Sequence, residues 1–173
     1  RMHIPDDPVG SDEDFDELIR RIDVAIEDSI DRVLTCRPDH LILGISAESI
    51  WGGGSEPARK IEARIKNRPG AEHLGVTQAA TALPAALKAL GDIENIAIVC
   101  PYYPVAIKHL QAFADEFGYN LVRTECLACD SPVNIAHMSE TDLREAVLKV
   151  NGDDIDAIIQ FGANLPMAYV AAE

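Results

Sequence analysis

The stretch from Leu41 to Ser55, LILGISAESIWGGGS, is the most informative part of the chain for its fold class. An apolar run leads into Gly44, a short polar turn follows, and three consecutive glycines (52–54) precede Ser55. This order predicts a buried strand that enters a turn rich in backbone N–H groups at the start of a helix. Such a turn offers hydrogen-bond donors and the positive end of a helix dipole to an anion.

A second stretch of the same kind lies near the other end of the chain. The run AIIQF (157–161) predicts a strand, and Gly162, Ala163 and Asn164 follow it as a turn before another apolar run. Two strand-to-turn cradles in one short chain favour a site for a small carboxylate or phosphate.

Predicted strands and helices alternate between these two stretches. The strands are expected at 40–46, 74–77, 95–100, 119–125 and 155–161, and the helices at 15–33, 55–68, 79–90, 104–117, 139–149 and from 163 onward, after a polar loop over 1–14. Because the central strands are apolar throughout, the pattern indicates an α/β fold with parallel sheets covered on both faces. Ligands of such sheets bind at the carboxyl ends of the strands.

Composition excludes several classes of protein. The chain has 173 residues and a formal net charge of −14, with four tyrosines, four phenylalanines and one tryptophan, which argues against a nucleic-acid surface. No apolar run approaches the ~20 residues of a membrane span, and no secretory signal is visible. We therefore expect a cytoplasmic protein, with both ends cut from a longer chain.

The four cysteines are expected to be reduced thiols. The pair Cys126 and Cys129 forms a lone CxxC without two further ligands of suitable spacing, so no metal site is predicted. No cofactor motif is present either, and we expect no cofactor.

Four segments resemble one known family in their order and spacing: GISAESIWGG (44–53), VTQAATALPAALKALG (76–91), CPYYPVAIKHLQAFADEFG (100–118) and IIQFGANLP (158–166). Over nearly the whole chain the sequence is similar to the aspartate/glutamate racemase superfamily, in its maleate isomerase and arylmalonate decarboxylase branch. The resemblance implies two pseudo-symmetric, flavodoxin-like lobes, here residues 1–91 and 92–173, with the site between them.

The resemblance also implies roles for individual residues. In this family one cysteine from each lobe moves a proton or attacks an alkene carbon, and the matching positions here are Gly44 and Gly162, so both thiols are absent. Ser46 and Tyr102 match groups that bind the substrate carboxylate. The complete set of substrate-binding residues expected from the resemblance is Gly44, Ile45, Ser46, Thr77, Tyr102, Gly162, Ala163 and Asn164.

Without these thiols, acid–base chemistry needs another proton donor. Glu48 follows Ser46 by two residues, and an apolar cleft beside Trp51 would raise its pKa into a useful range. Cys100 ends a core strand near the expected cleft, although free cysteines also pack as small apolar groups. Tyr102 is the third candidate, as a hydrogen-bond donor.

The leading interpretation is an enzyme that acts on a small mono- or dicarboxylate by an isomerase, racemase or decarboxylase (lyase) step. Two alternatives stay open: a non-catalytic carboxylate-binding relative, and a phosphate- or nucleotide-binding flavodoxin-like module that uses 52–55. The sequence lacks both common phosphate-loop motifs that the phosphate- or nucleotide-binding alternative would use. The expected partner is the small carboxylate, with no nucleic acid and no membrane, and the sequence leaves a homo-oligomer open.

Overall fold

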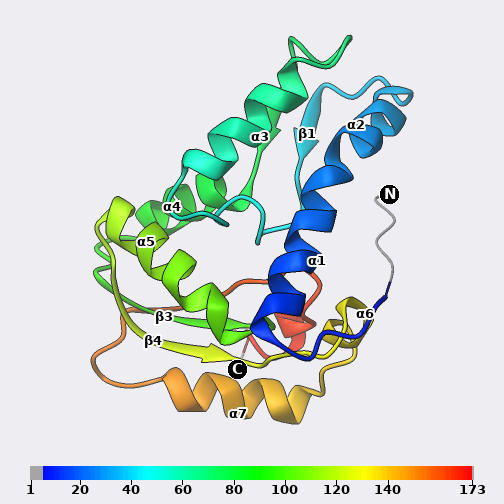
Figure 1. Ribbon diagram of the computed structural model, residues 1–173. Helices are drawn as coiled ribbons and strands as arrows, with labels where there is room; N and C mark the ends of the chain where they lie inside the picture. The colour runs from blue at the N-terminus through cyan, green and yellow to red at the C-terminus, as the bar shows by residue number, and fades with distance from the viewer. Residues whose placement is uncertain (1–5, 173) are drawn as a thin grey trace.

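The computed structural model describes residues 6–172. In it the chain folds into two parallel β-sheets with helices packed around them (Figure 1). Strand β1 (His40–Ile42) pairs with β2 (Gly75–Thr77), and the second sheet has the order β4 (Asn120–Cys126), β3 (Asn95–Cys100), β5 (Ala157–Gln160). The predicted α/β class with parallel sheets is confirmed. Residues 1–5 of the predicted N-terminal loop and Glu173 lie outside the described residues.

Most helices lie in the intervals that the sequence predicts for them, with some changes of boundary, whereas the short helix α6 is not predicted. They are α1 (Asp12–Val24), α2 (Ile26–Leu34), α3 (Glu56–Lys66), α4 (Ala79–Leu90), α5 (Ile107–Phe117), α6 (Pro132–Ile135) and α7 (Glu140–Val150), with 3-10 helices η1 (Pro104–Ala106) and η2 (Met167–Tyr169). No helix among the described residues is long and apolar enough to cross a membrane. We retain the lobe boundary at residue 91 as a proposal.

Strand β3 is apolar from Ile96 to Cys100 because both of its faces are covered. Ile96, Ile98 and Cys100 pack in the cluster that contains the buried residues of α5, whereas Ala97 and Val99 pack in the cluster that contains those of α7. Figure 1 shows these two helices on opposite sides of the three-stranded sheet. Successive side chains of a strand point to opposite faces, so a sheet covered on both sides demands an unbroken apolar run.

The predicted single helix over 15–33 is wrong in one respect, because the structure divides it at Ala25. The Ala25 N–H donates to the Ile22 carbonyl (3.0 Å), a tightened turn that ends α1. The apolar stripe continues across this point, but Ile26 and Ile30 of α2 pack in a different cluster from the buried residues of α1. Because the helix is divided, the apolar residues of α1 pack in one core and those of α2 pack in another.

Two further predicted elements are shorter than expected. Strand β1 ends at Ile42, and after Leu43, whose N–H still bonds the Thr77 carbonyl (2.9 Å), the backbone leaves the sheet. The helix predicted from 163 onward is reduced to η2. Pro166 lacks an N–H and disfavours a helical conformation in the residue before it, which explains the shortening.

Serine side chains or glycine cap several of the helix ends. The Ser11 and Ser139 hydroxyls accept hydrogen bonds from the N–H groups of Asp14 and Asp142, each at 3.1 Å. Gly118 ends α5 in the left-handed conformation (φ 78°) that favours glycine. These local signals define one end each of α1, α5 and α7.

Candidate functional site

A cavity of about 320 Å³ lies where the turns after β1 and β5 meet the end of β3. The residues predicted for the site that line it are Gly44, Ile45, Ser46, Tyr102, Gly162, Ala163 and Asn164. Helix α1 adds an apolar wall with Phe15, Leu18, Ile19 and Ile22, and Ile135 of α6 also lines the cavity. The fold thus gathers five segments that are far apart in the sequence.

A hydrogen-bonded unit forms the polar part of this cavity. The Ser46 Oγ lies 2.9 Å from the Tyr102 hydroxyl oxygen and accepts a hydrogen bond from the Gly162 N–H (3.0 Å). The two hydroxyl groups carry two hydrogens, and one of these joins them. The other hydrogen is free to be donated to an acceptor in the cavity, whichever hydroxyl carries it.

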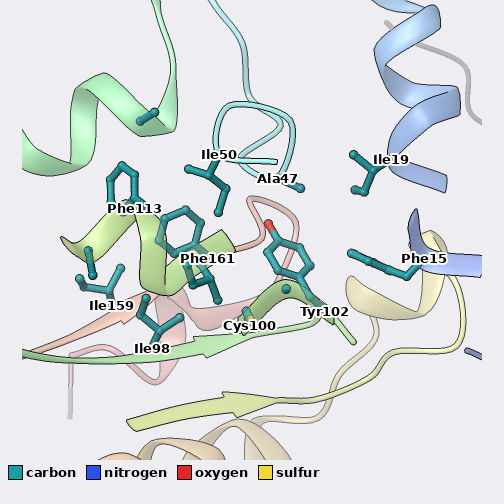
Figure 2. Close-up of a cluster of buried hydrophobic side chains, with 14 of the residues drawn as sticks. Phe15, Ile19, Ala47, Ile50, Ile98, Cys100, Tyr102, Phe113, Ile159 and Phe161 are labelled. Carbon is teal, nitrogen blue, oxygen red and sulfur yellow. The ribbon is translucent and has the colours of Figure 1, made fainter. Parts of the chain in front are cut away.

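Tyr102 is held in place by aromatic neighbours. Its ring centroid lies 5.3 Å from that of Phe15 and 6.4 Å from that of Trp51. Figure 2 shows Tyr102 between Phe15 of α1 and the strand end that carries Cys100, with its hydroxyl directed toward the loop that carries Ala47. Burial raises the pKa of the Tyr102 hydroxyl far above its ordinary value, so this group stays neutral and remains a donor.

The two glycines at the strand ends differ in their surroundings. A Cβ atom added at Gly44 would meet no other atom within 4 Å. A Cβ atom added at Gly162 would lie 2.5 Å from Cδ and Cγ of Pro101, and Gly162 has φ +91°. Position 44 therefore has room for a side chain, whereas position 162 requires glycine.

Thr77 and Cys100, both predicted for the site, do not line this cavity. The Thr77 hydroxyl lies 2.8 Å from Nε2 of His40 at an exposed edge of the first sheet. Cys100 is fully buried because its place in β3 directs it into the core below α5. Its hydrogen bond with Cys126 (Sγ to Sγ, 3.7 Å) and its burial raise the pKa of the Cys100 thiol well above the usual range.

Glu48, the third candidate proton donor, lines a neighbouring cavity of about 420 Å³ between α1 and α3. The N–H groups of Ile50 and Trp51 both bond the Ala47 carbonyl, so this turn is helical. Residues two apart in a helical turn do not share a face, which separates Glu48 from Ser46. Burial raises the pKa of Glu48 to about 8.

The glycine turn before α3 does hold an anion, but the anion belongs to the chain. The Ser55 N–H and hydroxyl donate to the two carboxylate oxygens of Glu116 at 2.6 and 2.5 Å. These hydrogen bonds lower the pKa of Glu116. A phosphate site at 52–55 thereby loses its donors, and the local sequence carries no sign of this because Glu116 lies on α5, 61 residues away.

The part of the chain from residue 6 to residue 172 holds no group of three or more His, Cys, Asp and Glu side chains placed to bind a metal ion. The lone CxxC contributes no such group, and Cys126 contacts Cys100 instead.

Comparison with solved structures places this arrangement among known folds. The Nocardia farcinica maleate cis-trans isomerase with a covalently bound succinylcysteine intermediate matches at a TM-score of 0.74 and 18% identity, over 93% of this chain and 64% of that one. The Pseudomonas putida S16 maleate isomerase with maleate matches at a TM-score of 0.69 and 19% identity, over 92% of this chain and 62% of that one. A liganded mutant of arylmalonate decarboxylase matches at a TM-score of 0.71 and 17% identity, over 92% of this chain and 63% of that one.

The chain spans less than two thirds of the length of these proteins. No protein-family model matches the chain, and no curated protein matches it significantly by sequence. The structural neighbours agree with the branch that the sequence resembles. The chain therefore has the fold of the maleate isomerases and arylmalonate decarboxylases.

Proposed function

We propose that the cavity between the two strand-end turns binds a small carboxylate, and that the chain isomerises or decarboxylates it without a cysteine. The observation that carries this proposal is the hydrogen-bonded unit of Ser46, Tyr102 and Gly162 in an otherwise largely apolar cavity. The unit offers a hydroxyl hydrogen to an oxygen anion and carries no negative charge of its own.

The walls of the cavity indicate the kind of carboxylate. Phe15, Leu18, Ile22 and Ile135 surround the polar unit with hydrocarbon. An apolar substituent on the substrate would be buried against them, and each buried methylene contributes about 0.8 kcal/mol. A carboxylate with an apolar or aryl body, such as a substituted malonate, fits these walls better than a small dicarboxylate alone.

A reaction that passes through an enediolate suits this environment. When a malonate-type substrate loses CO₂, the bond between the α-carbon and one carboxyl carbon breaks, and its electron pair is delocalised into the remaining carboxylate. Donors positioned at that group stabilise the charge that develops there. A proton then joins the α-carbon, and the hydroxyls of Ser46 and Tyr102 are the proton-bearing groups at hand, replenished from solvent.

A covalent route through cysteine is not part of this proposal. The matching isomerase from Nocardia farcinica holds a succinylcysteine intermediate. The cavity here is lined by Gly44 and Gly162, the two positions that the sequence resemblance matches to the family thiols. Cys100 points into the core instead.

One observation favours a second candidate function, a carboxylate-binding protein without catalysis. Among the described residues that line the cavity, Tyr102 is the one titratable side chain, and its pKa lies far from neutrality. A cavity without a group that titrates near pH 7 is suited to binding and poorly suited to fast proton transfer.

Proton NMR in D₂O with a panel of malonates, maleate, hydroxy-dicarboxylates and amino-dicarboxylates tests both functions. Loss of a carboxylate, alkene isomerisation or deuterium at the α-carbon supports the enzyme, and Tyr102→Phe should then lower turnover by roughly 100-fold. Tyr103→Phe is the matched control, because the Tyr103 hydroxyl donates to the Val9 carbonyl (2.6 Å) outside the cavity.

The outcomes separate the two candidates. Thermal stabilisation by one compound with no conversion of any compound supports the binding protein. Neither conversion nor stabilisation across the panel contradicts both.

A further inference from the structure

The cavity between α1 and α3 holds a buried acid without a partner. Glu48 lines this cavity of about 420 Å³ and is 3% exposed. Neither of its carboxylate oxygens has a hydrogen-bond partner among the described residues. Buried polar groups in native proteins are nearly always hydrogen-bonded, so a group of this kind calls for an explanation.

The basic residues around the cavity already have acidic partners. The charged residues that line the cavity with Glu48 are Asp16, Arg20 and Asp23 on α1 and Glu56, Lys60 and Arg64 on α3. Arg20 pairs with Glu17 at 2.6 Å, Lys60 lies 3.7 Å from Glu56, and Arg64 binds Asp23 and Glu27 at 2.5 and 2.7 Å. Glu48 is therefore the acid in this cavity that is left without a basic partner, which points to a cationic ligand.

The remaining walls suit an organic body on that ligand. Trp51, Ile19, Pro57 and Ile61 line the cavity, and the Trp51 Nε1–H donates to Asp16 (2.9 Å) at the rim. Aromatic rings attract cations, and the cavity volume lies in the usual range for small-molecule sites. A bare metal ion fits poorly, because no group of three potential ligands occurs within the described residues.

We propose that this cavity binds an organic ammonium ion, whose charged head pairs with the Glu48 carboxylate and whose apolar body lies against Trp51. An ammonium group has three N–H donors and supplies partners for both orphaned oxygens. The proposal does not depend on the function proposed for the other cavity, of about 320 Å³, which is lined by Ser46 and is called the Ser46 cavity below.

Binding of such a cation is expected to release a proton. Because burial raises the pKa of Glu48 to about 8, the empty cavity holds mainly the neutral acid at pH 7. The ammonium ion pairs with the carboxylate, so its affinity should rise by up to about ten-fold per pH unit below pH 8 and level off above it. Two other titratable groups nearby, Tyr102 and His109, have pKa values moved away from this range, since burial raises the first and lowers the second.

Isothermal titration calorimetry with benzylamine tests the proposal on the wild-type chain. Titrations at pH 7 in two buffers of different protonation enthalpy should show nearly one proton released per ligand bound. Benzyl alcohol has the same shape without the charge and should bind at least about ten-fold more weakly. Binding without proton release, or equal binding of the alcohol, overturns the proposal, as does the absence of binding at millimolar benzylamine.

Two variants locate the site. Glu48→Gln should lower benzylamine affinity at least about ten-fold and abolish the proton release. Glu56→Gln is the matched control, because Glu56 lines the same cavity but already pairs with Arg59 and Lys60. An equal loss in both variants, or no loss in Glu48→Gln, would show that Glu48 is not the anchor.

Discussion

The turns after β1 (44–46) and after β5 (162–164) line the same cavity, yet they are built differently. The first turn supplies a hydroxyl, Ser46, and leaves open space at Gly44. The second supplies a backbone N–H at Gly162, whose own position is filled by the ring of Pro101. One turn can accept a new side chain and the other cannot.

The two glycines that match the family's cysteine positions therefore differ in whether they can carry a side chain. The resemblance gives Gly44 and Gly162 the same status, as two positions where the family carries a thiol. Packing makes them unequal, because a side chain at 162 would displace Pro101, whereas one at 44 would enter the cavity. Equivalent positions in a sequence pattern are therefore not interchangeable positions in this structure.

The largest effect is expected for Gly162→Ala. The added methyl group meets the Pro101 ring at 2.5 Å, and φ +91° is a conformation that alanine rarely adopts. Steric overlap and backbone strain together should lower the free energy of unfolding by about 2–4 kcal/mol, measured by urea denaturation. Gly44→Ala is the matched control and should change it by less than about 0.5 kcal/mol. Equal effects at the two positions would remove the distinction between the turns.

Ser46→Ala should have the next largest effect, because Ser46 joins the two turns. Without its hydroxyl, the Gly162 N–H and the Tyr102 hydroxyl both lose their partner. An unsatisfied group in a partly buried place costs about 1–3 kcal/mol, so the variant should unfold at lower urea concentration and lose carboxylate-induced stabilisation. Retention of that stabilisation would mean that the hydroxyl does not contact the ligand.

Much of the fold follows from local sequence signals. Strand β3 lies where its apolar run predicts it, and the serine caps of α1 and α7 are likewise determined by neighbouring residues. Seven of the residues that the family resemblance predicts for the site line the Ser46 cavity, where turns that follow strands of the two sheets meet.

The features that sequence reasoning missed depend on contacts between distant residues. The division at Ala25 reflects two separate cores beneath one amphipathic stripe. The direction of Glu48 depends on a helical turn that no local motif predicts. Glu116 takes the Ser55 donors of the turn at 52–55 from another helix, and the local pattern, which predicts a ligand anion there, carries no sign of this contact.

Glu116→Gln concerns a third turn, at 52–55, whose Ser55 donors are already taken by a side chain of the protein. The two hydrogen bonds from Ser55 and the nearby helix N-terminus should be worth about 1 kcal/mol, a modest value because the Glu116 side chain is 39% exposed and solvent screens it. Since the folded-state pKa of Glu116 is lowered, this stabilisation is present above the unfolded-state value of about 4.3 and is lost as the pH falls through the lower folded value.

Urea denaturation between pH 3 and pH 7 measures this dependence. The stability difference between wild type and Glu116→Gln should shrink as the pH falls below about 4. Asp115→Asn, the next residue on α5, is the control and should show a smaller difference at neutral pH. A difference that does not vary with pH would mean that the carboxylate charge is not what closes this turn.

Gly44→Cys should have the smallest effect on stability and the most direct bearing on the cavity. Because the Cβ atom meets nothing within 4 Å, the free energy of unfolding should change by less than about 0.5 kcal/mol. The new thiol should react with a maleimide reagent, followed by peptide mass mapping in a Cys36→Ser background because the native Cys36 is exposed. A carboxylate that occupies the cavity should slow this labelling. If the thiol reacts at the same rate with and without a carboxylate that stabilises the chain, the ligand binds elsewhere and the open turn is not its site.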